Sequence, residues 1–133
     1  MKNLNNYIFE KILISKNTNI KHGANDHIDT LTCCDELYIY LDELWNDDDY
    51  WKNISDDPEE AREEFFDDFM GGNRKDCVDR ALTALVDNGR LSDEDADKYS
   101  NNMIILDFCT EIANLLMTNK FIDVNKIYQK IAF

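Results

Sequence analysis

Turn-forming residues are scarce in this chain, and that scarcity constrains the fold more than any other feature of the sequence. Four glycines and one proline occur among 133 residues. A β-sandwich or a barrel needs a turn every few residues and draws on glycine and proline to make it. Apolar residues make up 44% of the chain, which is enough for a buried core, and the length suits one domain. We therefore expect helices around a single core.

Apolar side chains recur at spacings of three and four residues, which is the pattern of amphipathic helices. Helix-start signals stand at Asp57-Pro58, Asn73, Ser92 and Asp123, and Gly89 fits the residue after a helix end. The segment 46–57 is expected to be an acidic loop. The predicted helices cover about residues 3–14, 26–45, 58–70, 74–88, 93–117 and 124–131, with a kink or break at Ser100-Asn101-Asn102.

The predicted architecture is all-α, a compact single domain of about five to six helices. Residues 1–25 form an N-terminal amphipathic helix and its connector, with the helix semi-detached from the remainder. Residues 26–133 form the helical domain. This domain contains residues 35–68, which we call the acidic block.

Negative charge is concentrated in the acidic block. The chain has 28 acidic and 14 basic residues and a net charge of −14, of which the block carries −13. Its fifteen carboxylates stand against Lys52 and Arg62 alone. A chain this acidic should bind neither nucleic acid nor an anionic membrane through its bulk charge. A block this concentrated instead creates a local field that can steer a protein partner.

The cysteines and the hydropathy pattern indicate the compartment. No run of about 18 apolar residues is present, so no transmembrane helix is expected. The start of the chain has no apolar run or small-residue cleavage site, so we expect no secretory signal. Cys33, Cys34, Cys77 and Cys109 do not have the spacing of a disulfide framework, and the last two fall at apolar helix positions. We expect structural thiols in a reducing cytoplasm.

Metal-binding patterns are weak. A zinc site would recruit His22, His27, Cys33 and Cys34, whose spacing is irregular and includes no Cys-x-x-Cys pair. The stretch 87–92 resembles the middle of a calcium-binding loop, but apolar residues stand where the first two carboxylate ligands belong. We predict no metal and no cofactor, and the four-residue zinc set stays an open alternative.

Catalytic patterns are also weak. Nothing in the sequence orients a histidine toward Cys33, and there is no nucleophile elbow and no phosphate-binding glycine loop. A general acid needs a pKa raised by burial, and the acidic block has no evident buried position. We therefore predict that the protein is not an enzyme.

The density of carboxylates in the acidic block is of the right order to imitate a nucleic-acid backbone. A helix rises ~1.5 Å per residue, which gives about one carboxylate per 3.4 Å, and one strand of B-DNA has a phosphate about every 3.4 Å. The fitting partner is a protein with a basic groove that normally holds nucleic acid. The residues predicted to bind it are Asp42, Glu43, Asp47, Asp48, Asp49, Tyr50, Trp51, Asp56, Glu59, Glu60, Glu63, Glu64, Asp67 and Asp68.

The competing interpretation is a solvated acidic face that keeps a helical domain soluble. Most aromatic residues of the block fall at helical core spacings and should pack inside. Tyr40 lies off the apolar stripe, and Tyr50 and Trp51 lie in the predicted loop. These three suit an interface anchor, but for each residue taken singly, anchoring of the loop onto the core is the preferred interpretation.

The N-terminus resembles the leader segments of tailed-phage internal head proteins. The matching residues are Met1, Lys2, Tyr7, Ile8 and Glu10, over about ten residues. Such leaders direct packaging into the capsid and are cleaved after a Glu. In size and charge the whole chain is similar to small acidic phage proteins that inhibit CRISPR or restriction systems. The resemblance implies action in the host cytoplasm.

Three functional hypotheses follow from these observations. The first is a non-enzymatic, phage-type inhibitor that binds the basic groove of a host defence protein through a DNA-mimicking surface. The second is a virion or assembly component docked through Tyr7, Ile8 and Ile12 of the first helix. The third is a helical oligomeric adaptor. The sequence names neither the partner nor the oligomeric state.

Overall fold

The computed structural model of the protein describes residues 27–133, and this part of the chain forms α-helices and no strand. The all-α prediction is confirmed, with a helix count slightly above the expected one. The N-terminal helix predicted at 3–14 and its connector lie outside the described residues. The helices are α2 (Thr30–Asn46), α3 (Asp48–Ile54), α4 (Pro58–Asp67), the 3-10 helix η1 (Asp68–Met70), α5 (Arg74–Asp87), α6 (Asp93–Ser100), α7 (Met103–Met117) and α8 (Val124–Ala132).

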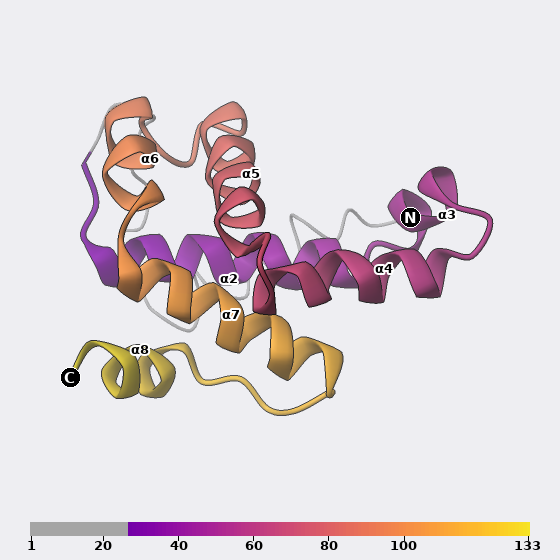
Figure 1. Cartoon of the computed structure of the whole chain (residues 1–133). Coiled ribbons are helices and arrows are strands. Elements are labelled where there is room, and N and C mark those ends of the chain that lie inside the picture. The colour runs from indigo at the N-terminus through magenta and orange to yellow at the C-terminus, as the bar shows by residue number, and fades with distance from the viewer. Residues whose placement is uncertain (1–26) are drawn as a thin grey trace, which may run out of the picture.

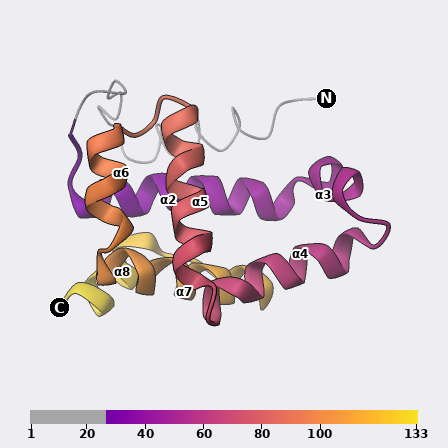
Figure 2. The same ribbon diagram turned by 45° about the horizontal axis from the view of Figure 1, so that its top comes forward.

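Helices α2 and α7 pack against each other and form the centre of the domain (Figure 1). The antiparallel pair α5 and α6 stands over one side of this centre, and α8 packs against α7 and α2. Helix α3 lies beyond the C-terminal end of α2, and α4 runs back from it toward α7, so that Figure 2 shows α3 at the end of the molecule farthest from α6 and α8. The centre is therefore shared by helices from both halves of the described chain.

Side chains from α2, α5, α7 and the α4–η1 segment fill one core. The residues with no exposed area include Leu37 and Leu41 of α2, Val78 of α5, and Phe108 and Ile112 of α7. Phe66 and Phe69 bring α4 and η1 into the same cluster. Burial of this much aliphatic and aromatic surface supplies the main driving force for folding.

The buried stripe of α2 agrees only in part with the one that helical spacing predicts, which is Ile28, Leu31, Cys34, Tyr38, Leu41 and Trp45. Tyr38 and Trp45 were expected to face inward, but they are half-buried, while Leu37 and Leu44 are buried in their place. The reason is that α2 touches both α5 and α7, so its apolar face is wider than a single stripe and is rotated toward these two helices.

Capping residues set most helix ends where the sequence predicts them. The side chains of Asp57, Ser92 and Asp123 each accept a hydrogen bond from a first-turn backbone N–H, as expected. Gly89 has φ 72° and ends α5, as predicted. Asn73 does occupy the position before α5, but its side chain makes no capping hydrogen bond.

Two helix boundaries are defined only by the structure. The expected acidic loop at 46–57 is wrong in part, because Asp47 caps the seven-residue helix α3 by accepting from the backbone N–H of Tyr50. At residues 100–102, where a kink or a break was expected, the structure has a full break. Asn102 accepts from the backbone N–H groups of Ile104 and Ile105 and so starts α7 as a new helix.

Candidate interaction surface

The larger part of the acidic block folds into a helical hairpin at one end of the molecule, and the rest of the block lies on α2. Residues 47–68, which we call the acidic hairpin, comprise α3, the turn at Ser55–Asp57 and α4 with the start of η1. The hairpin carries eleven carboxylates and two basic residues, Lys52 and Arg62. Ten of these carboxylates are exposed, and Asp47 is half-buried. The hairpin therefore gathers most of the charge of the acidic block on one projecting part of the fold.

Trp51 holds the hairpin to the body of the domain. Its side chain is only 2% exposed. Its indole N–H donates a hydrogen bond of 2.7 Å to the carbonyl of Leu44, near the end of α2. Its ring packs against Phe65 and Phe66 of α4, with centroids 5.7 and 6.3 Å apart. These contacts fix α3 against both α2 and α4.

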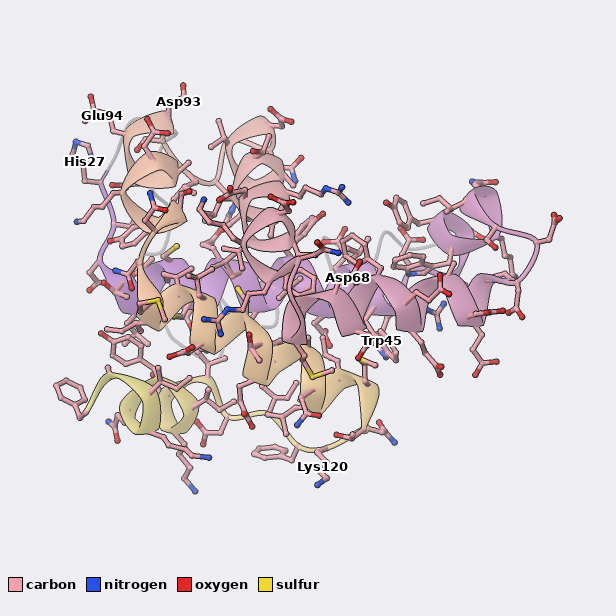
Figure 3. The ribbon with its side chains drawn as sticks, viewed as in Figure 1. His27, Trp45, Asp68, Asp93, Glu94 and Lys120 are labelled. Atoms are coloured by element: carbon pink, nitrogen blue, oxygen red, sulfur yellow. The ribbon has the colours of Figure 1, made fainter. Side chains whose placement is uncertain are left out.

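Arg62 provides a second link. Its guanidinium donates to a carboxylate oxygen of Asp48 at 2.7 Å, which joins α4 to α3. It also lies 5.5 Å above the ring of Trp45, the α2 residue labelled beside α4 in Figure 3. Among the described residues, this is the one ion pair that neutralises a carboxylate of the hairpin. No other carboxylate of the hairpin forms an ion pair with a residue in the range 27–133.

The helix of α4 sets the spacing of its carboxylates. Glu59, Glu60, Glu63, Glu64, Asp67 and Asp68 are all exposed. From the first to the last of them the chain rises about 14 Å, so one carboxylate occurs every ~2.7 Å, between the ~1.7 Å of duplex DNA and the ~3.4 Å of one strand. The surface is thus as dense in negative charge as a nucleic-acid backbone.

An apolar pair lies among these charges. Tyr50 is 40% exposed and Ile54 is 55% exposed. They stand four residues apart on α3 and therefore share one face of it. Ile54 was missed by the sequence analysis. Recognising α3 as a helix would have been enough to find the pair.

Trp51 and Asp42, both predicted to contact a partner, do not belong to the exposed surface of the hairpin. Trp51 is 2% exposed and belongs to the core, which agrees with its interpretation as an anchor of this segment, and little of its side chain is left for a partner. Asp42 is half-buried on α2 and lines a pocket of about 180 Å³, together with Trp45, Leu115 and Lys120 among others. The pocket lies between α2 and the α7–α8 connection, away from the turn of the hairpin. Tyr40 is also half-buried and packs on the core.

The acidic block does contain buried carboxylates, contrary to the prediction. Glu36 is 3% exposed and accepts two hydrogen bonds from Arg90, of 2.7 and 2.8 Å. Glu43, predicted to contact a partner, is half-buried on α2. Burial raises the pKa of Glu43 to about 7, and the neighbouring charges of Asp47 and Asp42 add to the shift. Neither group is exposed in the way that the α4 carboxylates are.

The four cysteines are free and buried, as predicted for structural thiols. Burial raises the pKa of Cys34 to about 12 and raises the pKa values of Cys33, Cys77 and Cys109 as well. A thiol is a poor nucleophile and a poor metal ligand until it loses its proton. These side chains therefore act as small apolar groups of the core.

His27 does not turn toward the cysteines. Its side chain is 65% exposed and its ring nitrogens lie 3.4 Å from Glu94 and 3.2 Å from Asp95 (Figure 3). Asp95 is buried and accepts the backbone N–H of Ile28 at 2.9 Å, which fixes the start of the described chain to α6. Within residues 27–133, no three His, Cys, Asp or Glu side chains are grouped so as to hold a metal ion. His22 lies outside the described residues.

Comparison of the chain with protein-family models, with curated proteins and with solved structures finds no significant match in any of the three. None of the helices in the described part of the chain is both long and apolar enough to cross a membrane.

Proposed function

We propose that this protein is a non-enzymatic, phage-type inhibitor that binds the basic nucleic-acid-binding groove of a host defence protein through the acidic hairpin. The observation that carries the proposal is the run of six exposed carboxylates from Glu59 to Asp68 on one short, projecting helical segment. A protein surface with the charge density of a nucleic-acid backbone competes for the same arginines and lysines that bind phosphate.

The anchoring of the hairpin supports a rigid surface. Trp51 is buried against both arms, and the ion pair between Arg62 and Asp48 bridges them. A surface that is already ordered loses little conformational entropy on binding, so more of its interaction energy appears as affinity. The carboxylates therefore act as a pre-formed array.

The face of α3 adds an apolar contact to this array. Tyr50 and Ile54 are exposed beside the carboxylates of the hairpin turn. Charge steers association and sets its salt dependence, whereas desolvated aromatic and aliphatic anchors slow dissociation. The partner should therefore have an apolar recess beside its basic groove.

The experiment compares two variants with equal change in net charge. The hairpin variant carries Asp49→Asn, Asp56→Asn, Glu60→Gln and Glu64→Gln. The control variant carries Asp76→Asn, Asp87→Asn, Asp93→Asn and Asp97→Asn, which remove four exposed carboxylates outside the acidic block. Each protein is immobilised and used to capture proteins from bacterial lysate at low and at high salt, after circular dichroism has shown that the fold is kept.

We expect the wild type and the control to retain a nucleic-acid-binding protein that duplex DNA and high salt both release. The hairpin variant should retain at least tenfold less of it, because each lost phosphate-like contact weakens a salt-sensitive interaction. Equal capture by the two variants would contradict the proposal. So would a captured partner that duplex DNA does not displace.

A further inference from the structure

Helix α8 has a cationic outer face on a molecule that is otherwise strongly acidic. Lys126 and Lys130 are exposed, as are Asn125 and Gln129, whereas Ile127 is buried against the core. Lys120 lies in the connection before α8 and points away from the core (Figure 3). No ion pair joins these three lysines to another residue in the part of the chain that the structure describes. The only carboxylate of this segment, Asp123, is half-buried and caps α8.

One exposed phenylalanine precedes α8 in the chain and another follows it. Phe121 is 88% exposed and Phe133 is 96% exposed, the two highest values among the large apolar residues of the described chain. Exposed phenylalanines beside charged groups are typical of a protein-binding surface and are costly to leave in water. We call Lys120, Phe121, Lys126, Lys130 and Phe133 the α8 face.

Helix α8 and the hairpin lie too far apart to meet within one chain. Helix α8 is at one end of the molecule and α3 is at the other, in both orientations of the ribbon (Figures 1 and 2). Lys120 is not at the α8 end, because it lines the pocket bordered by Trp45 and Asn46 of α2. A contact of Lys126 and Lys130 with the hairpin therefore has to join two copies.

The two surfaces match in charge and in spacing. Lys126 and Lys130 are four residues apart, which places their stems about 6 Å apart along the axis of α8. Glu60 and Glu64 have the same separation on α4, and both are exposed. The hairpin also offers Tyr50 and Ile54 as apolar partners for the two phenylalanines. The two surfaces therefore have opposite charges, and both have exposed apolar residues.

We propose that the α8 face docks on the acidic hairpin of a second copy of this chain. The contact is head-to-tail, so each copy keeps one free hairpin and one free α8 face, and association can continue beyond a dimer. Exposed ion pairs of this kind are weak and are screened by salt. Self-association covers the hairpin, so it would compete with any other partner of that surface.

The test uses sedimentation velocity of the full chain over a range of concentrations, at low and at high salt. At low salt the mean mass should rise with concentration above the monomer mass of 15.6 kDa, and at high salt it should return toward that value. Variant A carries Lys126→Glu and Lys130→Glu, and variant B carries Glu60→Lys and Glu64→Lys. The control carries Arg80→Glu and Lys98→Glu, the same charge change as variant A at exposed sites outside the α8 face.

Variants A and B should each stay monomeric alone, because like charges then face each other, and their mixture should associate as the wild type does. The control should also associate. A wild type that is monomeric under every condition, association that variant A retains, or a mixture that stays monomeric would each overturn the proposal. Binding of the wild-type monomer to anionic vesicles through the α8 lysines would also overturn the proposal, because the partner of the α8 face would then be a lipid surface and not a second copy. Variant A leaves the hairpin intact, so its capture of a host partner reports on the proposed function separately.

Discussion

The indole N–H of Trp51 donates a hydrogen bond of 2.7 Å to the carbonyl of Leu44, and this bond ties the acidic hairpin to α2. The two residues are seven positions apart, on either side of the reversal that Asp47 makes between two helices. The indole N–H of the buried Trp51 side chain therefore has a hydrogen-bond acceptor inside the core. The position of the charged surface depends on this contact.

Replacement of Trp51 should lower the free energy of unfolding, and the loss should be larger when the ring is removed than when only its hydrogen bond is removed. Trp51→Phe keeps most of the ring packing and removes the hydrogen bond, so we expect a loss of about 1 kcal/mol in the free energy of unfolding. Trp51→Ala also removes the ring and should cost about 3–5 kcal/mol. Urea denaturation followed by circular dichroism measures both. Equal stability of the Phe and Ala variants would contradict this role.

The pair between Glu36 and Arg90 predicts a second, separable loss of stability. Arg90→Met leaves the buried carboxylate of Glu36 without its guanidinium and should lower the free energy of unfolding by about 3 kcal/mol. Arg90→Lys should recover only part of this loss, because an ammonium group cannot make both hydrogen bonds. The double variant Glu36→Met with Arg90→Met should be more stable than Arg90→Met alone. A double variant that is less stable than the single one would show that the pair is not the source of the effect.

Glu43 predicts a pH-dependent stability. Its pKa is about 7 in the folded chain, against an ordinary value of 4.5, so the folded state holds the proton more tightly. The free energy of unfolding should therefore fall as the pH rises from 4.5 to about 7. Glu43→Gln should be more stable than the wild type at pH 8, by about 1 kcal/mol after allowance for solvent screening, and equal to it at pH 4.

Denaturation of Glu43→Gln and of the exposed control Glu63→Gln at the two pH values separates this effect from the general benefit of removing a negative charge. The control should gain less at pH 8. A Glu43→Gln advantage of the same size at pH 4 and pH 8 would contradict the assignment.

The buried thiols predict slow chemical modification. Cys33, Cys34 and Cys109 have no exposed area and their pKa values are raised by burial, so few thiolates form and reagents cannot reach them. An aromatic disulfide reagent should react with the native protein far more slowly than with the urea-unfolded chain. Rapid reaction of all four thiols in the native protein would mean that the core opens readily.

Local signals made much of this fold predictable from the sequence. Asp57 followed by Pro58, Ser92, and Gly89 each act within one turn of helix, so their effect does not depend on distant contacts. The apolar residues of α5 that recur at helical spacing are all buried, namely Cys77, Val78, Ala81, Leu82 and Leu85. Helix α3 was missed because seven residues are too short to show a clear period, and its cap is hidden in a run of three aspartates.

Contacts between distant residues could not be predicted in this way. Glu36 pairs with a residue 54 positions away, so its burial among so many exposed carboxylates has no local signature. Trp51 is buried because Phe65 and Phe66 return beside it on α4, which requires the reversal of the chain to be known. The clustering of charge on the hairpin was visible in the sequence, but which carboxylates are exposed was not.

Displacement of DNA from the captured partner tests the central claim most directly. The purified partner is bound to a fluorescent DNA duplex, and the anisotropy is followed as this protein or its hairpin variant is added. We predict that the wild type releases the duplex, that release weakens steeply with salt, and that the hairpin variant needs at least ten times more protein. Formation of a ternary complex with the duplex still bound, or equal release by the hairpin variant, would contradict the account.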